Sequence, residues 1–274
     1  MFTLNCKGRL LMIENPIVMG IINATPDSFY EGSRFMGEKN ILEQAEKMLK
    51  EGADILDIGG QSTRPGSHQL SEEEELKRVI EPIEVILKKF PEAIISIDTY
   101  QSKVAVEAVA AGASIVNDIS GGNLDAGMLQ TVGKLNVPYI CMHMQGTPQT
   151  MQKEPHYQNV TKEVLDFFIH KIDACKKAGI HDVIIDPGFG FGKTIKHNFE
   201  LLKNLSVFKM LEKPLLLGVS RKSTIYKTLG VNANEALNGT TVVNTIGLMN
   251  GANILRVHDV KEAKEGVRLF AAMS

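Results

Sequence analysis

Three carboxylates stand where short apolar runs of the sequence end, and they could form a site for a hydrogen-bonding ligand. Asp98, Asp118 and Asp186 each close such a run, and Asn117 precedes Asp118. A carboxylate accepts two parallel N–H donors, whereas an amide both donates and accepts. Taken singly, each aspartate is better explained as a helix N-cap or a loop tether. If all of them face one mouth, they predict a site for a flat, polar, nitrogen-rich ring.

Positively charged groups follow other apolar runs. Arg64 lies in the loop STRPGS, Arg221 and Lys222 lie in SRKS, and Arg256 and His258 alternate in RVHD. Alternate residues of a strand point the same way, so Arg256 and His258 are expected to share an anion. A surface salt bridge is as good an interpretation of Arg221 as a ligand contact.

The segment IIDPGFGFGKT, residues 184–194, suggests a nucleotide-binding loop because it combines glycines with a Lys-Thr pair. The first glycine of that motif would fall at position 187, which is occupied by Pro187. Proline lacks the backbone N–H that a phosphate cradle needs. The spacing therefore argues against a P-loop.

Metal and nucleophile motifs are also absent from the sequence. There is no H-E-x-x-H spacing for zinc and no G-x-S-x-G elbow for a serine nucleophile. A Mg²⁺ ion could still be shared between the side-chain oxygen of Asn23 and a bound diphosphate, because Mg²⁺ often uses few protein ligands.

The elements that must position these residues are short apolar runs separated by helical patterns. The runs span residues 16–22, 53–59, 93–98, 114–118, 137–142, 182–186, 214–219 and 252–257. Continuous hydrophobicity is typical of parallel strands covered on both faces. Eight strands alternating with helices predict an α/β fold, a single (βα)8 TIM barrel over residues 1–274. Residues 2–13 alternate around Lys7-Gly8 and predict a small β-hairpin that closes the bottom of the barrel.

A doubly wound open sheet is the alternative architecture. It would gather ligand groups at one switch point between strands. Here polar residues end nearly every predicted strand, and a closed barrel brings all eight ends into one ring. The distribution favours the barrel.

Composition restricts the class of protein. The formal net charge is -2 among 274 residues, which argues against a broad nucleic-acid or membrane-binding surface. Three cysteines without paired spacing indicate a reduced, cytoplasmic chain, and the N-terminus lacks the pattern of a signal peptide.

Together these motifs resemble dihydropteroate synthase, the family of folate-pathway enzymes that sulfonamides inhibit. The likeness covers nearly the whole chain and rests on ordered motifs: MGIINATPDSF, DIGGQSTRPGS, SIDT, IVNDISGG, HMQGTP, DPGFGFGKT, GVSRKS and RVHD. It implies a transferase that joins dihydropterin-methyl diphosphate to 4-aminobenzoate, giving dihydropteroate and diphosphate, with Mg²⁺ as cofactor. The family's barrels often pair, so a homodimer is expected.

The resemblance also implies roles for individual residues. The pterin would be held by Asp98, Asn117, Asp186, Lys222 and Arg256. The diphosphate would be bound by Asn23, Arg256 and His258, with Asn23 also contacting Mg²⁺. The aminobenzoate pocket would be shaped by Thr63, Arg64, Pro65, Phe191, Lys222 and Ser223. A first loop with Asp27 and Ser28 would close over the reacting atoms, and the catalytic set would be Asp27, Arg64, Asp98 and Lys222.

Two departures from the family pattern and two rival functions stay open at this point. Gln61 replaces the usual glutamate, which makes anchoring of the second loop less certain, and YEGSR replaces an acidic-Gly-Gly stretch. A methyltransferase acting on methyltetrahydrofolate would share the pterin site but would not need a diphosphate site. A non-catalytic pterin-binding homologue would be expected to lose Asn23, Arg64 or Lys222, and all three are present.

Overall fold

Eight parallel strands of the described chain form one sheet that curls into a barrel. The computed structural model describes residues 1–24, 34–61, 69–151 and 154–273, with the backbone alone at 34–38. The strands are β3 (Ile17–Asn23), β4 (Ile55–Gly59), β5 (Ile95–Asp98), β6 (Ile115–Asp118), β7 (Tyr139–Met142), β8 (Val183–Asp186), β9 (Leu216–Leu217) and β10 (Ile254–Val257). Their order is β8-β7-β6-β5-β4-β3-β10-β9, and a parallel bridge between Ile185 and Leu215 joins its two ends. This closure confirms the predicted barrel over the open sheet.

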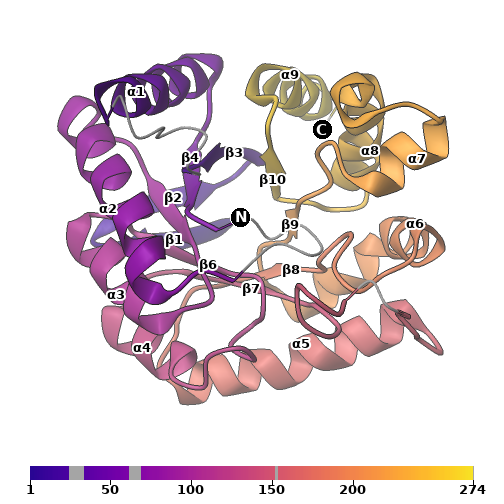
Figure 1. Ribbon diagram of the computed structural model, residues 1–274. Coiled ribbons are helices and arrows are strands. Elements are labelled where there is room, and N and C mark those ends of the chain that lie inside the picture. The colour runs from indigo at the N-terminus through magenta and orange to yellow at the C-terminus, as the bar shows by residue number, and fades with distance from the viewer. Residues whose placement is uncertain (25–33, 62–68, 152–153, 274) are drawn as a thin grey trace.

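Helices surround the strands as an outer ring (Figure 1). They are α1 (Arg34–Glu51), α2 (Glu72–Lys89), α3 (Ser102–Ala111), α4 (Met128–Leu135), α5 (Val160–Lys177), α6 (Ile195–Lys203), α7 (Ser223–Leu229), α8 (Leu237–Met249) and α9 (Val260–Ala271). Short 3-10 helices follow α6 (Leu205–Leu211) and α7 (Ala233–Glu235). Apolar side chains from helices and strands meet in one buried layer, so the strands are covered on their outer face as predicted.

Local sequence explains where the helices begin and end. The Ser71 hydroxyl accepts the Glu74 N–H, and the Glu74 carboxylate accepts the Ser71 N–H, which caps the first turn of α2. Four glutamates in that turn suit the positive end of the helix dipole. Gly52, at φ +99°, follows α1 and supplies the left-handed backbone that stops it.

The N-terminal hairpin closes the bottom of the barrel. Strands β1 (Phe2–Cys6) and β2 (Arg9–Ile13) pair antiparallel. Leu4, Cys6 and Ile13 are buried against the N-terminal residues of the barrel strands, and the Asn5 N–H donates to Asp182 at 2.7 Å. The bottom is thus sealed by apolar packing, which confirms the predicted hairpin and leaves the opposite end for ligands.

One strand is shorter than predicted. The run at 214–219 yields only the two residues of β9. The Leu215 N–H donates to the side chain of Asn253 at 3.0 Å rather than to a neighbouring strand. The Leu215 carbonyl accepts the N–H groups of Asn253 and Ile254, so Leu215 is bonded to the chain at β10 through both its carbonyl and its N–H.

None of the helices in the described segments has the length and apolar character needed to span a membrane.

Candidate active site

A cluster of charged side chains lies inside the barrel mouth, at the carboxyl ends of the strands. Arg256 on β10 donates from Nε to Asp57 on β4 at 2.6 Å and from Nη2 to Asp98 on β5 at 2.6 Å. Asn117 on β6 donates from Nδ2 to Asp57 at 3.0 Å. Residues from four strands thus form one hydrogen-bonded cluster around Arg256 and Asp57, as the barrel prediction requires.

Asp57 is a site residue that the sequence analysis did not assign. Its side chain is fully buried, and its Oδ2 accepts from both Arg256 and Asn117 while Oδ1 has no hydrogen-bond partner. It was missed because it lies inside an apolar run rather than at the end of one. The sequence did contain a signal for Asp57. A carboxylate within a strand that is expected to be buried on both faces requires a partner.

Asp186 ends β8 on the same mouth. Its Oδ1 accepts the Gly188 N–H at 2.8 Å, and its electrostatic neighbours include Lys222 and Arg256. Burial raises the pKa of the Asp186 carboxyl, although Lys222 opposes this shift. Burial likewise raises the pKa of the Asp98 carboxyl, against the effect of Arg256. Both carboxyls are therefore poorly solvated groups that gain from a ligand with N–H donors.

Lys222 faces Asp186 from the loop after β9. Its Nζ donates to the carbonyl of Phe189 and lies 4.6 Å from the centroid of the Phe191 ring. Burial lowers the pKa of this ammonium to about 8, partly offset by Asp186. The Phe191 ring packs against a mouth-side apolar cluster that includes Met142 and Met144.

His258 stands beyond Arg256 at the rim. Its backbone N–H donates to the Ser220 hydroxyl at 3.2 Å, and that hydroxyl lies 3.0 Å from His258 Nδ1. The hydroxyl has one proton and two lone pairs, so it is a partner for Nδ1 in either tautomer of the neutral ring. Partial desolvation and then Arg256 lower the pKa of His258 to about 4, so the ring is neutral at pH 7.

Arg221 takes the structural role that the sequence left open. Its Nε and Nη2 donate to the two carboxylate oxygens of Asp259 at 2.8 and 2.9 Å, and Nη1 donates to the carbonyls of Ala233 and Asn234. These bonds connect the loop after β9 to Asp259, which follows His258. Of the two cations in that loop, Lys222 is therefore the one that faces the mouth.

Asp118 does not face the mouth, contrary to the expectation that the three strand-end carboxylates share it. It is fully buried and accepts from Tyr139 Oη at 2.7 Å, the Ser120 hydroxyl at 2.7 Å and the N–H groups of Ser120 and Gly122. Successive strand residues point to opposite faces, so once Asn117 points inward Asp118 must point outward. Its role is to fix the turn after β6.

The remaining predicted site residues divide into two groups. Asn23 ends β3 and Ser223 begins α7, both on the carboxyl side of the barrel. The second group lies outside the described residues. It consists of Asp27, Ser28, Thr63, Arg64, Pro65 and the first four residues of the stretch YEGSR.

Gln61 anchors the chain at the base of the second loop. Its Nε2 donates to Tyr100 Oη at 2.7 Å, and its Oε1 accepts the Leu70 N–H at 3.3 Å. An amide can donate and accept at once, whereas an ionised carboxylate only accepts. The expected loss of anchoring therefore does not occur at these two bonds.

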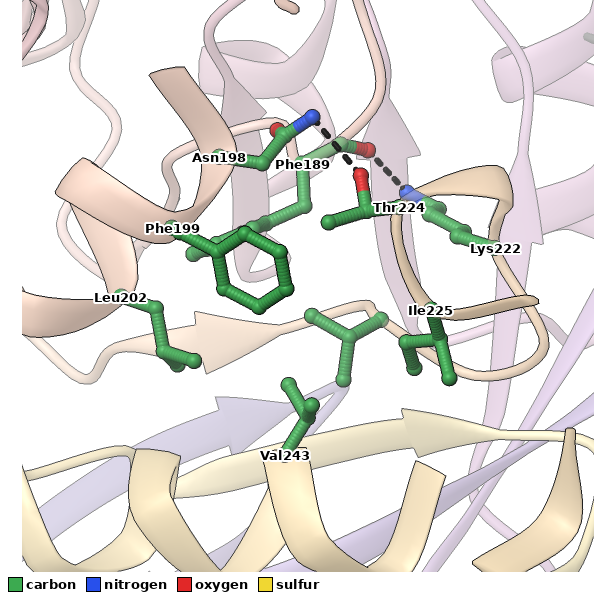
Figure 2. A pocket seen from close by; sticks show the side chains of 9 residues that line it. Phe189, Asn198, Phe199, Leu202, Lys222, Thr224, Ile225 and Val243 are labelled. Atoms are coloured by element: carbon green, nitrogen blue, oxygen red, sulfur yellow. Dashed lines mark hydrogen bonds between the residues drawn. The ribbon is translucent and has the colours of Figure 1, made fainter. Parts of the chain in front are cut away.

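A small apolar cavity of about 10 Å³ lies behind the mouth, between α6, α7 and α8. Figure 2 shows Phe199, Ile225 and Val243 turned toward it, with Lys222 and Phe189 along one side. The volume is about that of one water-sized sphere, too small for a substrate ring. Within the described residues there is also no group of three or more His, Cys, Asp or Glu side chains that could hold a metal ion.

The barrel and its charged mouth define an enzyme that binds a flat heterocycle. The family of pterin binding enzymes matches residues 19–258, and the chain belongs to this family.

Within this family the chain is similar to dihydropteroate synthases. It is 44% identical over 268 residues to dihydropteroate synthase of Escherichia coli strain K12, covering 97% of this chain and 94% of that protein. The enzyme of Haemophilus influenzae is 41% identical, with 98% of each chain covered.

Solved structures agree with these relatives. Yersinia pestis dihydropteroate synthase, solved with a sulfonamide drug complex, superposes with a TM-score of 0.93 at 41% identity and 99% coverage of both chains. The Xanthomonas albilineans enzyme in complex with 7,8-dihydropteroate has a TM-score of 0.89 at 36% identity, covering 99% and 98%. The predicted family, barrel fold and enzyme class, a transferase of folate biosynthesis, are confirmed.

Proposed function

We propose that this chain condenses (7,8-dihydropterin-6-yl)methyl diphosphate with 4-aminobenzoate, giving 7,8-dihydropteroate and diphosphate. One observation carries the proposal: Arg256, held by Asp57 and Asp98, shares a single basin with Asn117, Asp186 and Lys222. The basin thus offers carboxylate acceptors, an amide and two cations, a set that matches the alternating donors and acceptors of a pterin edge.

In this proposal the carboxylates bind the ring. Asp186, facing Lys222, accepts the paired N–H donors of the pterin, while Asp98 and Asn117 bind polar atoms elsewhere on its edge. Each charge-assisted bond in a partly desolvated site contributes about 1.5–3 kcal/mol. Arg256 is held by its two carboxylates on one side, so its planar face can lie against the ring.

The diphosphate is assigned to the rim. Arg256 supplies positive charge, and the His258 ring, which contacts Ser220 through Nδ1, donates to the diphosphate from Nε2. The described residues offer no protein cage for a metal, but the side-chain oxygen of Asn23 at the end of β3 suits Mg²⁺, which is commonly bound by one or two protein oxygens together with substrate phosphates. When bound, Mg²⁺ would neutralise charge on the leaving diphosphate.

The reaction breaks the bond between the pterin methylene carbon and the diphosphate oxygen, and the aminobenzoate nitrogen forms the new bond to that carbon. The nitrogen then loses its extra proton, which diphosphate or water can accept. The pterin ring delocalises positive charge on the methylene, so Arg256 and His258 act by stabilising the departing anion. Alignment of the two substrates contributes up to ~7–11 kcal/mol of the barrier.

The second substrate is assigned to the wall formed by Phe191, Lys222 and Ser223, with Thr63, Arg64 and Pro65 completing it. Lys222 lies over the Phe191 ring and therefore borders both substrates. Asp27 and Ser28 are assigned to a loop that closes over the reacting atoms and excludes water. The Yersinia pestis relative was solved with a sulfonamide, and we propose that sulfonamides occupy this aminobenzoate pocket here too.

The proposal extends to assembly and location. Val242, Ile246 and Met249 are exposed apolar residues at helical spacing on one face of α8, and Leu229 on α7 is exposed as well. This face suits a second copy of the chain, so we propose a homodimer formed through α7 and α8. The three cysteines are free and buried, which suits a reducing, cytoplasmic compartment.

The assay is to mix the protein with Mg²⁺, the pterin diphosphate and 4-aminobenzoate and to follow diphosphate and dihydropteroate together. Diphosphate release that depends on aminobenzoate is the expected result. A methyltransferase or a non-catalytic pterin-binding protein would release none, and either outcome would refute the proposal.

A matched pair of variants tests the residue assignment. Asp186→Asn removes a carboxylate that faces the mouth, and Asp118→Asn removes one of equal burial that faces away. We expect Asp186→Asn to raise the KM for the pterin diphosphate about 10- to 150-fold, the equivalent of about 1.5–3 kcal/mol. Asp118→Asn should lower stability and change this KM less than about threefold, a factor worth under 1 kcal/mol.

A further inference from the structure

Lys193 is a buried lysine that the proposed reaction does not use. Its side chain is 2% exposed, and none of the described carboxylates forms a salt bridge with it. Its Nζ lies 2.9 Å from His143 Nδ1 and 3.0 Å from the carbonyl oxygens of both Gly188 and Phe191. The carbonyl of His143 is a fourth, longer contact at 3.3 Å. Three close acceptors match the three N–H donors of an ammonium group.

These contacts join two neighbouring strand ends. His143 follows β7, whereas Gly188 and Phe191 belong to the loop after β8. His143 Nδ1 lies within hydrogen-bond distance of Nζ, and burial lowers the pKa of Lys193 well below its usual value, against the effect of Asp186. Burial and then Lys193 lower the pKa of His143 to about 2, which keeps its ring neutral.

The loop that Lys193 holds would otherwise be free to change conformation. Gly188, Gly190 and Gly192 all have positive φ, at 70°, 82° and 62°. Glycine at such positions has many accessible conformations, so the loop needs external contacts to keep one of them. Other side chains bind the loop as well: Asn198 Oδ1 accepts the Gly190 N–H, and Tyr157 Oη donates to the Gly192 carbonyl.

The same loop places two of the groups assigned to the aminobenzoate wall. The Phe189 carbonyl accepts from Lys222 Nζ, a contact drawn in Figure 2, and the Phe191 ring lies beneath that ammonium. The two carbonyls bound by Lys193, at 188 and 191, flank the carbonyl bound by Lys222. A shift of either end of this segment therefore moves the Phe191 ring and the acceptor of Lys222 together.

We propose that Lys193 is a positioning residue for the aminobenzoate half of the site, a buried hydrogen-bond donor that holds the loop after β8 against β7 and thereby sets the Phe191 ring and the Lys222 ammonium. This inference rests on the proposed condensation reaction. It also accounts for the Gly-Lys-Thr sequence without nucleotide binding: the lysine donates to the protein's own backbone carbonyls rather than to a phosphate.

The test is Lys193→Met, which retains the apolar length of the side chain and removes all of its donors. We expect the KM for 4-aminobenzoate to rise at least 10-fold and kcat to fall, while the KM for the pterin diphosphate rises several-fold less, because Asp98, Asn117 and Arg256 lie on other segments. Tyr157→Phe is the matched control, since it removes one hydrogen bond to the same loop at Gly192. It should lower the Tm but leave both KM values within twofold of the wild type.

Wild-type activity separates the two proposals. A wild type that forms no dihydropteroate refutes the proposed function. The ratio of the two KM values in Lys193→Met tests the positioning role of Lys193. Equal changes in both KM values, or values like those of Tyr157→Phe, would overturn the positioning role.

If Lys193→Met does not fold, His143→Leu gives a second test, because it removes one acceptor and leaves the two loop carbonyls bound. It should raise the KM for aminobenzoate about fivefold relative to that for the pterin diphosphate, the equivalent of about 1 kcal/mol. Unchanged KM values in a folded His143→Leu variant would also overturn the proposal.

Discussion

Arg256 Nε lies 2.6 Å from Asp57 Oδ2, although 199 residues separate the two in the chain. The strands that carry them, β10 and β4, each pair with β3, so the barrel leaves only one strand between the two residues. Burial lowers the pKa of the Arg256 guanidinium, but Asp57 and then Asp98 outweigh burial and raise it. The cation in the mouth is therefore permanently charged and held from below by a carboxylate that no solvent reaches.

Removal of the buried carboxylate should affect both stability and activity. Asp57→Leu leaves Arg256 with Asp98 alone, and breaking a buried ion pair from one side costs about 3–5 kcal/mol. We expect a fall of this size in the free energy of unfolding, measured by urea denaturation, and a loss of kcat/KM for the pterin diphosphate. Asp57→Asn is the control, because it retains an oxygen acceptor and should lose less of both. A free energy of unfolding for Asp57→Leu within about 0.5 kcal/mol of the wild type, the range of ordinary surface changes, would contradict the pairing.

The lowered pKa of Lys222 predicts a pH dependence of catalysis. Burial brings this pKa to about 8, so the ammonium loses its proton as the pH rises through 8. We expect kcat/KM, which reports the free enzyme, to fall above pH 8. Lys222→Arg should have lower activity but no such decline up to pH 9, because a guanidinium stays protonated. If both enzymes decline alike, the titrating group is not Lys222.

His143 predicts a loss of stability in mild acid. Its folded pKa is lowered to about 2, below the value of about 6.5 in an unfolded chain, so the unfolded state binds the extra proton between these pH values. Its contribution is present above pH 6.5 and is lost as the pH falls. Between pH 7 and pH 5 we expect the free energy of unfolding of the wild type to fall by about 2 kcal/mol more than that of His143→Gln, as measured by urea denaturation. Parallel losses would show that another group is responsible.

Gln61 should stabilise the base of the second loop through its two hydrogen bonds. Gln61→Met leaves the Leu70 N–H and the Tyr100 hydroxyl without this partner, so we expect a stability loss of about 1–3 kcal/mol by chemical denaturation. Tyr100→Phe removes only one of the bonds and should cost about half as much. Equal stability of Gln61→Met and the wild type would mean that neither bond contributes.

Much of the fold was predictable because parallel, doubly covered strands are visible as continuous apolar runs. Seven of the eight predicted runs contain one observed strand each, and the run 16–22 covers all of β3 except Asn23. β9 was overestimated because the apolar run PLLLGV continues on both sides of its two residues, and hydrophobicity alone does not mark where strand pairing ends. The polar ends of the strands predicted the position of the site because a barrel must collect them at one mouth.

The order of residues along the chain is enough to show which residues end the strands. It also requires neighbours such as Asn117 and Asp118 to face opposite ways, because a strand has a two-residue period, so the expectation that both face the mouth was already in conflict with it. Tertiary structure alone decided which of the two points into the mouth, because the barrel sets the phase of every strand at once. It also decided that Asp57 holds Arg256, that Arg221 pairs with Asp259, and that Lys193 binds backbone carbonyls. Each of these contacts depends on distances between residues far apart in the chain, and those distances exist only after the barrel has closed.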